Sequence, residues 1–198
     1  MEPAAGCVRL KSMHVVETRP TAQLAEPRLA RMESSSRTWL TPGYSTSTAF
    51  INLSPGLVCV FAGADGLALT HQQVGEAAPS ARQLWNESAD RLTRRALVDT
   101  GVEFLVRCPS AALGHSPLRG YEVDGHGAPA ASWLAHPKTF TVLHRHFESV
   151  LKPRNELMYV TRNDRDLFVF DAPIADVRAL APRASILTYS VGFPLMHH

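Results

Sequence analysis

The sequence lacks an excess of charge of either sign. Its 198 residues hold 20 lysines and arginines against 18 aspartates and glutamates, a formal net charge of +2. Residues 1–99 and residues 100–198 each contribute 10 basic and 9 acidic side chains, so neither half contains a basic arm or an acidic tail. Because nucleic-acid-binding proteins concentrate positive charge on one face or segment, we expect no nucleic-acid partner.

Paired cysteines and long apolar runs are also missing. The three cysteines, Cys7, Cys59 and Cys108, are an odd number without a C-x-x-C pair, which excludes a disulfide framework and a zinc knuckle. The first ten residues carry Glu2 where a signal peptide needs positive charge, and the longest nearby apolar run, 57–64, is too short to span a bilayer. The sequence therefore predicts a protein of the reducing cytoplasm, with no membrane partner.

Sequence signatures of catalysis are absent as well. The chain contains neither the phosphate-binding loops of nucleotide enzymes nor a G-x-S-x-G nucleophile turn nor an H-E-x-x-H zinc motif. We therefore expect no cofactor and assign no metal ligands and no catalytic residue from motifs. This pattern favours a non-enzymatic binding or adaptor module.

Helical and strand periodicities alternate along the rest of the chain. They predict an α+β fold, in which helices pack against a mainly antiparallel sheet. The expected helices are 80–98, 137–151 and 172–180. The expected strands are 46–53, 57–62, 67–70, 102–107, 121–124, 156–161, 167–170 and 185–191.

Two hairpins stand out among these strands. Pro55 and Gly56 suit a type II turn between the first two strands, because proline fixes a negative φ and glycine accepts a positive one. Residues 167–170 are apolar on both faces, so the hairpin that they form with 156–161 is expected in the middle of the sheet, covered on both sides.

The expected helices carry recognisable termini. Ser80 and Gln83 match a capping box, Pro137 fits a first helical position, and Asp171 is expected to cap the last helix. The middle helix carries an apolar stripe at helical spacing, which indicates that this face is buried in the core. The stripe contains Phe140, Leu143, Phe147, Val150 and Leu151.

The outer face of the 80–98 helix is strongly charged. It carries Glu87, Asp90, Arg91, Arg94 and Arg95, with acidic and basic residues four apart in the order that stabilises a helix. We interpret this face as solvated; a phosphate-binding face is the alternative.

The first 38 residues are the least regular. A short helix starting near Pro27 is predicted, followed by a serine-rich linker at 33–37. We therefore expect an N-terminal extension, 1–38, before a single domain, 39–195. Two similar lobes, 39–124 and 130–195, are the alternative, because glycines and Pro129 interrupt the chain between them.

Four blocks of sequence carry a family resemblance. They are Leu57–Phe61, Leu69–Gly75, Leu84–Leu92 and Leu157–Asp171. In order and spacing over about residues 50–175, they resemble the YtpQ-like family of bacterial proteins, a domain of unknown function. The resemblance implies a cytoplasmic protein of mixed α and β structure, and it implies no catalytic residue.

The densest polar group lies between the strands of the second hairpin. One interpretation is a solvated turn, because asparagine and aspartate tolerate turn conformations. The other is a recognition site, because arginine can bind a carboxylate or phosphate through two parallel hydrogen bonds. The residues of this candidate binding site are Arg162, Asn163, Asp164, Arg165 and Asp166.

A second arrangement leaves a small hydrolase or metal-dependent enzyme as the alternative function. His144 and Glu148 are four residues apart and share a helix face, as two ligands of one ion must, and Asp166 is a further candidate. The alternative interpretation of His144 is a structural one, in which its ring packs at the boundary of the core. The favoured function remains binding of a protein partner, with a homodimer left open.

Overall fold

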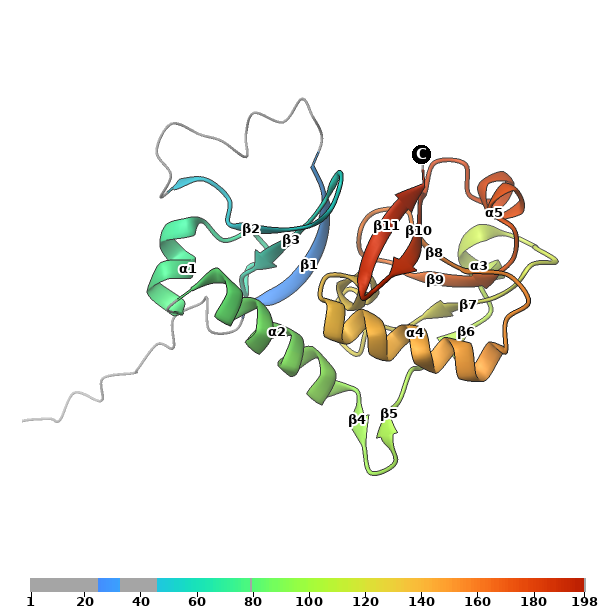
Figure 1. The fold of residues 1–198 in the computed structure, drawn as a ribbon, viewed down its shortest axis with the longest axis horizontal. Helices are drawn as coiled ribbons and strands as arrows, with labels where there is room; N and C mark the ends of the chain where they lie inside the picture. The colour runs from blue at the N-terminus through green and yellow to red at the C-terminus, as the bar shows by residue number, and fades with distance from the viewer. Residues whose placement is uncertain (1–24, 33–45, 79, 198) are drawn as a thin grey trace, which may run out of the picture.

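The structure is a computed structural model that describes residues 25–32, 46–78 and 80–197. In this part of the chain, helices and antiparallel strands form an α+β fold, which confirms the predicted class (Figure 1). No helix among the described residues is long and apolar enough to cross a bilayer. The predicted linker at 33–37 and most of the predicted extension lie outside the described residues.

The strands form three antiparallel sheets. The first has the order β1-β3-β2 and the large sheet has the order β11-β10-β8-β9-β7-β6, while β4 and β5 make a short hairpin. The strands of the first sheet and the hairpin are β1 (Glu26–Arg31), β2 (Phe50–Ser54), β3 (Leu57–Ala62), β4 (Leu97–Val98) and β5 (Gly101–Val102). Those of the large sheet are β6 (Val106–Arg107), β7 (Arg119–Val123), β8 (Leu157–Thr161), β9 (Phe168–Asp171), β10 (Ser185–Ser190) and β11 (Phe193–His197).

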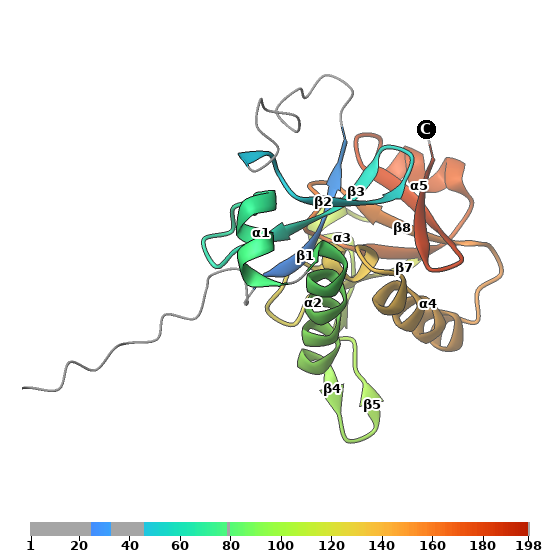
Figure 2. The same cartoon turned by 60° about the vertical axis from the view of Figure 1, so that its left-hand side comes forward.

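Helices cover both faces of the large sheet (Figures 1 and 2). On one face α4 packs its apolar stripe, and on the other α5 and α3 enclose a smaller apolar cluster that includes Met158 and Phe170. The helices are α1 (His71–Ala77), α2 (Ala81–Arg95), α3 (Ser110–Leu113), the 3-10 helix η4 (Ala130–Leu134), α4 (Pro137–Leu151) and α5 (Ile174–Leu180). The predicted central, doubly covered hairpin is confirmed as β8 and β9, whose residues are all buried.

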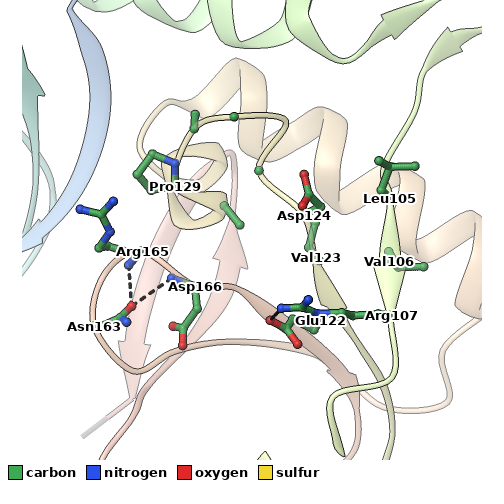
Figure 3. A pocket seen from close by; sticks show the side chains of 14 residues that line it. Leu105, Val106, Arg107, Glu122, Val123, Asp124, Pro129, Asn163, Arg165 and Asp166 are labelled. Carbon is green, nitrogen blue, oxygen red and sulfur yellow. Dashed lines mark hydrogen bonds and ion pairs between the residues drawn. The ribbon is translucent and has the colours of Figure 1, made fainter. Parts of the chain in front are cut away.

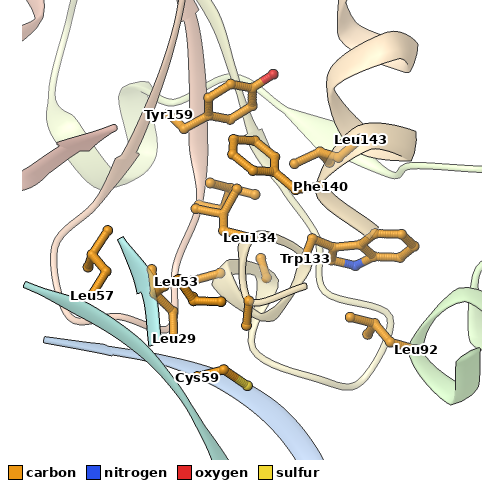
Figure 4. Packing of buried hydrophobic residues seen from close by; sticks show 14 of the residues in the cluster. Leu29, Leu53, Leu57, Cys59, Leu92, Trp133, Leu134, Phe140, Leu143 and Tyr159 are labelled. Carbon is orange, nitrogen blue, oxygen red and sulfur yellow. The ribbon is translucent and has the colours of Figure 1, made fainter. Parts of the chain in front are cut away.

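One hydrophobic cluster joins the first sheet to the large sheet. η4 lies between them, and Trp133 and Leu134, both fully buried, pack in the same cluster as Leu29 of β1 and Tyr159 of β8 (Figure 4). The large sheet also takes strands from both sides of residues 125–129. The predicted break there therefore does not divide the chain into two lobes.

The short helix predicted from Pro27 is wrong. Residues 26–31 form β1, which pairs with β3 and belongs to the first sheet. Burial alternates, with Pro27 and Leu29 inside, and β1 is an edge strand, where a proline without an N–H is tolerated.

Several other boundaries differ from the prediction. The 80–98 helix ends at Arg95, where the β4–β5 hairpin begins, and the 102–107 strand is divided between β5 and β6. Residues 67–70 contribute only isolated bridges, and α1, α3 and β11 were not predicted. Val150 is 52% exposed and does not belong to the buried stripe of α4.

Two predicted caps also require correction. Ser80 caps α2 through the N–H of Gln83, but the Gln83 side chain donates to Glu87 instead of closing a box. Asp171 does not cap α5. Its carboxylate accepts hydrogen bonds from the backbone N–H groups of Arg154 and Asn155, and it thereby fixes the loop between α4 and β8.

His136 caps α4 with its ring. Its Nδ1 accepts the backbone N–H of Lys138 at 3.0 Å, so the neutral ring carries its proton on Nε2 and donates it to Asn86 Oδ1 at 3.1 Å. The ring also packs on Trp85, with centroids 4.2 Å apart. Burial lowers the pKa of His136 to about 4, although Asp90 acts in the opposite direction.

We expect this cap to make stability depend on pH. Between pH 6.5 and about 4 the unfolded chain binds a proton at His136 that the folded chain does not, so the free energy of unfolding falls as the pH falls. The loss is at most about 3 kcal/mol across this range. Urea unfolding of wild type and His136→Asn, which can still cap the helix, should give a smaller pH slope for the variant; equal slopes would contradict the assignment.

Candidate functional site

A cavity of about 520 Å³ lies where the β8–β9 loop faces the end of β7 and the loop that follows it (Figure 3). Its walls combine exposed apolar side chains, Leu105 and Val106 of the β6 region, with charged ones. The polar residues that line it are Arg107, Glu122, Asp124, Asn163, Arg165 and Asp166. Three members of the predicted binding site therefore line one cavity.

The β8–β9 loop is held in shape by its own side chains. Asn163 Oδ1 accepts the backbone N–H groups of Arg165 and Asp166, each at 3.0 Å (Figure 3). Asp164 adopts a left-handed backbone conformation with φ of 58°, which aspartate tolerates better than most residues. The predicted turn role of Asn163 and Asp164 is thus confirmed.

Arg162 and Asp166 are bound to each other within the loop. Asp166 accepts hydrogen bonds from Arg162 Nε, from the backbone N–H of Arg162 and from the Thr161 hydroxyl. The Arg162 guanidinium also donates to the backbone oxygen of Ala112 at 2.8 Å and lies 5.1 Å from the centre of the Phe168 ring. These contacts attach the loop to α3, and they give Nε and Nη1 of this arginine structural partners.

Asp164 connects the loop to the first sheet. Its Oδ1 lies 3.6 Å from Arg31 Nε at the end of β1. Burial raises the pKa of Asp164, and the charges of Arg31 and Arg28 oppose that change. The loop is therefore anchored on both sides, at α3 and at β1.

Arg165 differs from the other four residues. Its backbone oxygen accepts the N–H of Ala131 at 3.1 Å, whereas its guanidinium has no hydrogen-bond or ion-pair partner among the described residues. The side chain is exposed and extends beside Pro129 toward β1 (Figure 3). Fixed at its backbone and free at its tip, Arg165 can contact a ligand.

A second cavity, about 370 Å³, adjoins the first. The two share Gly127, Pro129 and Arg165, so Arg165 stands between them. The other charged residues that line the second cavity are Glu26 and Arg28 of β1 and Arg95 at the end of α2. The pair of cavities, which we call the seam, extends from β6 and β7 of the large sheet to β1 of the first sheet.

Each carboxylate of the first cavity has at least one partner. Glu122, only 7% exposed, forms an ion pair with Arg107 through Oε1, while its Oε2 is buried without a partner. Asp124 Oδ1 accepts the backbone N–H of His126 at 2.7 Å.

His144 and Glu148 lie elsewhere. His144 Nε2 is 3.4 Å from Glu148 Oε1, its Nδ1 is 2.8 Å from the Tyr159 hydroxyl, and its ring stacks on Tyr189. Burial lowers the pKa of His144 despite the nearby Glu148. Neither residue lines the cavity that contains Asp166, so the three candidates of the alternative enzyme do not share it. In the described part of the chain, no three histidine, cysteine, aspartate or glutamate side chains are placed to hold a metal ion.

The sequence did not single out Arg28, Ser132 or Glu122 as site residues. They belong to segments that are distant in sequence. The packing of η4 against β1 brings Arg28 and Ser132 to the second cavity. Arg95 of the second cavity is different, because it was identified from the sequence on the charged face of α2, for which a phosphate-binding face was the alternative.

No family model, curated protein or solved structure matches the chain. The resemblance to the YtpQ-like family stays a prediction from the sequence.

The two arginines of the loop should respond differently to substitution. Arg162→Ala removes an ion pair, a hydrogen bond to Ala112 and a ring contact, and is expected to lower the free energy of unfolding by about 1–2 kcal/mol. Arg165→Ala removes no hydrogen bond or ion pair with any described residue and should change the free energy of unfolding by less than about 0.5 kcal/mol. Urea unfolding measures both, and equal losses would contradict the structural role assigned to Arg162.

Proposed function

We propose that this protein is a non-catalytic binding module that holds an extended segment of a partner protein along the seam. The observation that carries the proposal is Arg165, whose guanidinium has no partner within the described part of the chain and lies between two adjoining cavities. Binding sites need polar groups that are held in place yet not already satisfied, and Arg165 combines both properties.

The composition of the seam supports a peptide ligand. Leu105 and Val106 are 53% and 43% exposed at the first cavity and offer apolar contact area. Charged groups of both signs lie beside them, which is typical of protein interfaces with a polar rim. A segment that crosses from one cavity to the other has to pass Arg165.

The rigidity of the loop supports the same proposal. Asn163, Asp166 and Arg162 fix the loop from within, and Asp164 fixes it to β1. A preformed loop loses little conformational freedom when a ligand binds, so more of the contact energy contributes to affinity. We place the protein in the cytoplasm, in agreement with the free thiols of Cys59 and Cys108.

Selection from a display library of random peptides tests the proposal. Wild type is expected to enrich a common motif, and Arg165→Glu should lose that motif because the substitution reverses the charge between the cavities. Arg183→Glu is the matched control, since Arg183 is exposed and lines a different cavity.

The selected peptide should then be titrated against each protein, with its affinity measured by fluorescence anisotropy. We expect Arg165→Glu to bind at least about tenfold more weakly and the control to bind like wild type. Enrichment of the same motif by all three proteins, or of no motif by wild type, would overturn the proposal.

A further inference from the structure

We propose that the second cavity of the seam is a binding site for the phosphoryl group of a phosphomonoester. This deepens the proposed function, because it names the chemistry of part of the ligand. The cavity holds about 370 Å³, enough for such a group together with the atoms that carry it.

Three arginines from separate elements line this cavity. Arg28 comes from β1, Arg95 from the last position of α2, and Arg165 from the β8–β9 loop. Among residues 25–32, 46–78 and 80–197, the Arg28 guanidinium makes one long hydrogen bond, 3.3 Å, to the backbone oxygen of Gly66, and the Arg165 guanidinium makes none. Guanidinium groups bind phosphate oxygens through paired, charge-assisted hydrogen bonds, so donors remain available for such a ligand.

The charge of the cavity distinguishes a phosphoryl group from a carboxylate. Glu26 forms an ion pair with Arg95, and the charged lining residues together carry a net charge of +2. A phosphomonoester carries about −1.5 to −2 near pH 7, whereas a carboxylate carries −1. The phosphoryl group therefore neutralises the cavity more completely.

Ser132 gives an independent indication of a ligand. It lines the same cavity, its side chain is fully buried, and its Oγ has no hydrogen-bond partner among the described residues. A buried hydroxyl without a partner is unfavourable, and a hydrogen bond to an oxyanion in the cavity would relieve this once the Ser132 side chain turns toward it. This observation is separate from the arginines and points to the same chemistry.

The glycines of the cavity leave room beside the backbone. A Cβ at Gly66 or Gly127 would meet no atom within 4 Å. Both have positive φ, 77° and 81°, which favours glycine at these turns. Small residues at these positions let a ligand approach closely.

Titration with phenyl phosphate and with inorganic phosphate, at constant ionic strength in chloride, tests the site by calorimetry. We expect wild type to bind both, and Arg28→Gln and Arg165→Gln each to weaken binding by about tenfold. Arg183→Gln is the matched control and should bind like wild type. Equal affinity in all four proteins would overturn the site. The absence of binding by wild type at about 10 mM phosphate would overturn it as well, because a site with a weaker affinity is too weak to be useful.

Ser132→Ala separates a ligand role from a structural one. It removes a buried hydroxyl that has no hydrogen-bond partner in the described part of the chain, so the melting temperature should stay the same or rise. Phosphate binding should nevertheless weaken by about fivefold. A variant with unchanged phosphate affinity would count against a site that includes this hydroxyl.

A third experiment, with a phosphorylated peptide, identifies the source of the phosphoryl group. A phosphoserine version of the selected peptide that binds more tightly than phenyl phosphate would support a modified partner segment, and equal affinity would support a free phosphomonoester. If peptide selection fails while phosphate still binds, only the proposed partner is overturned. If the peptide binds at Arg165 and phosphate does not bind, only the phosphoryl site is overturned.

Discussion

The packing of η4 against both sheets is the constraint on which the rest of the structure depends. Trp133 and Leu134 are fully buried in a cluster that reaches from β1 to β8, so η4 packs between the first sheet and the large sheet. The same turn is tied to the β8–β9 loop by the hydrogen bond from Ala131 to Arg165. Apolar burial therefore sets the position of the seam, and the hydrogen bonds of the loop only refine it.

Most charged residues of the β8–β9 loop are paired within the fold. Asp166 is paired with Arg162, and Asp164 lies 3.6 Å from Arg31, so Arg165 is the one charged residue of the loop without an ion-pair partner among the described residues. A loop in which every arginine were paired would present no binding group, and one in which none were paired would not hold a fixed geometry. The observed division gives a rigid support for one exposed cation.

Sequence periodicity predicted the elements that bury a continuous apolar face. The helix at 137–151 and the hairpin of β8 and β9 were placed correctly because Phe140, Leu143 and Phe147 follow one helix face and residues 167–170 are uniformly apolar. Pro27 misled the assignment of β1, since a helical stripe and an alternating strand coincide over so few residues. Tertiary pairing with β3, which the local sequence does not encode, decided the outcome.

The site was predictable only in part, for the same reason. The loop 162–166 could be identified because its polar residues are consecutive, but the distinction between Arg162 and Arg165 depends on Ala112 and Phe168. The second cavity could not be predicted, because β1, α2, η4 and the loop each contribute one or two residues to it. Sites assembled from distant segments leave no spacing to detect.

The two cavities of the seam differ in charge, and this difference gives the site a direction. The second has three arginines and one carboxylate, whereas the first has two arginines and three carboxylates, with Arg165 common to both. Within about a Debye length, roughly 8–10 Å at moderate salt, such charges are only partly screened. An anionic group is thus favoured at the β1 end of the seam and disfavoured at the β6 end, where Leu105 and Val106 provide apolar contact instead. A bound segment would be oriented by this gradient even before any specific side-chain contact forms, because the reverse orientation places its anion beside Glu122 and Asp124.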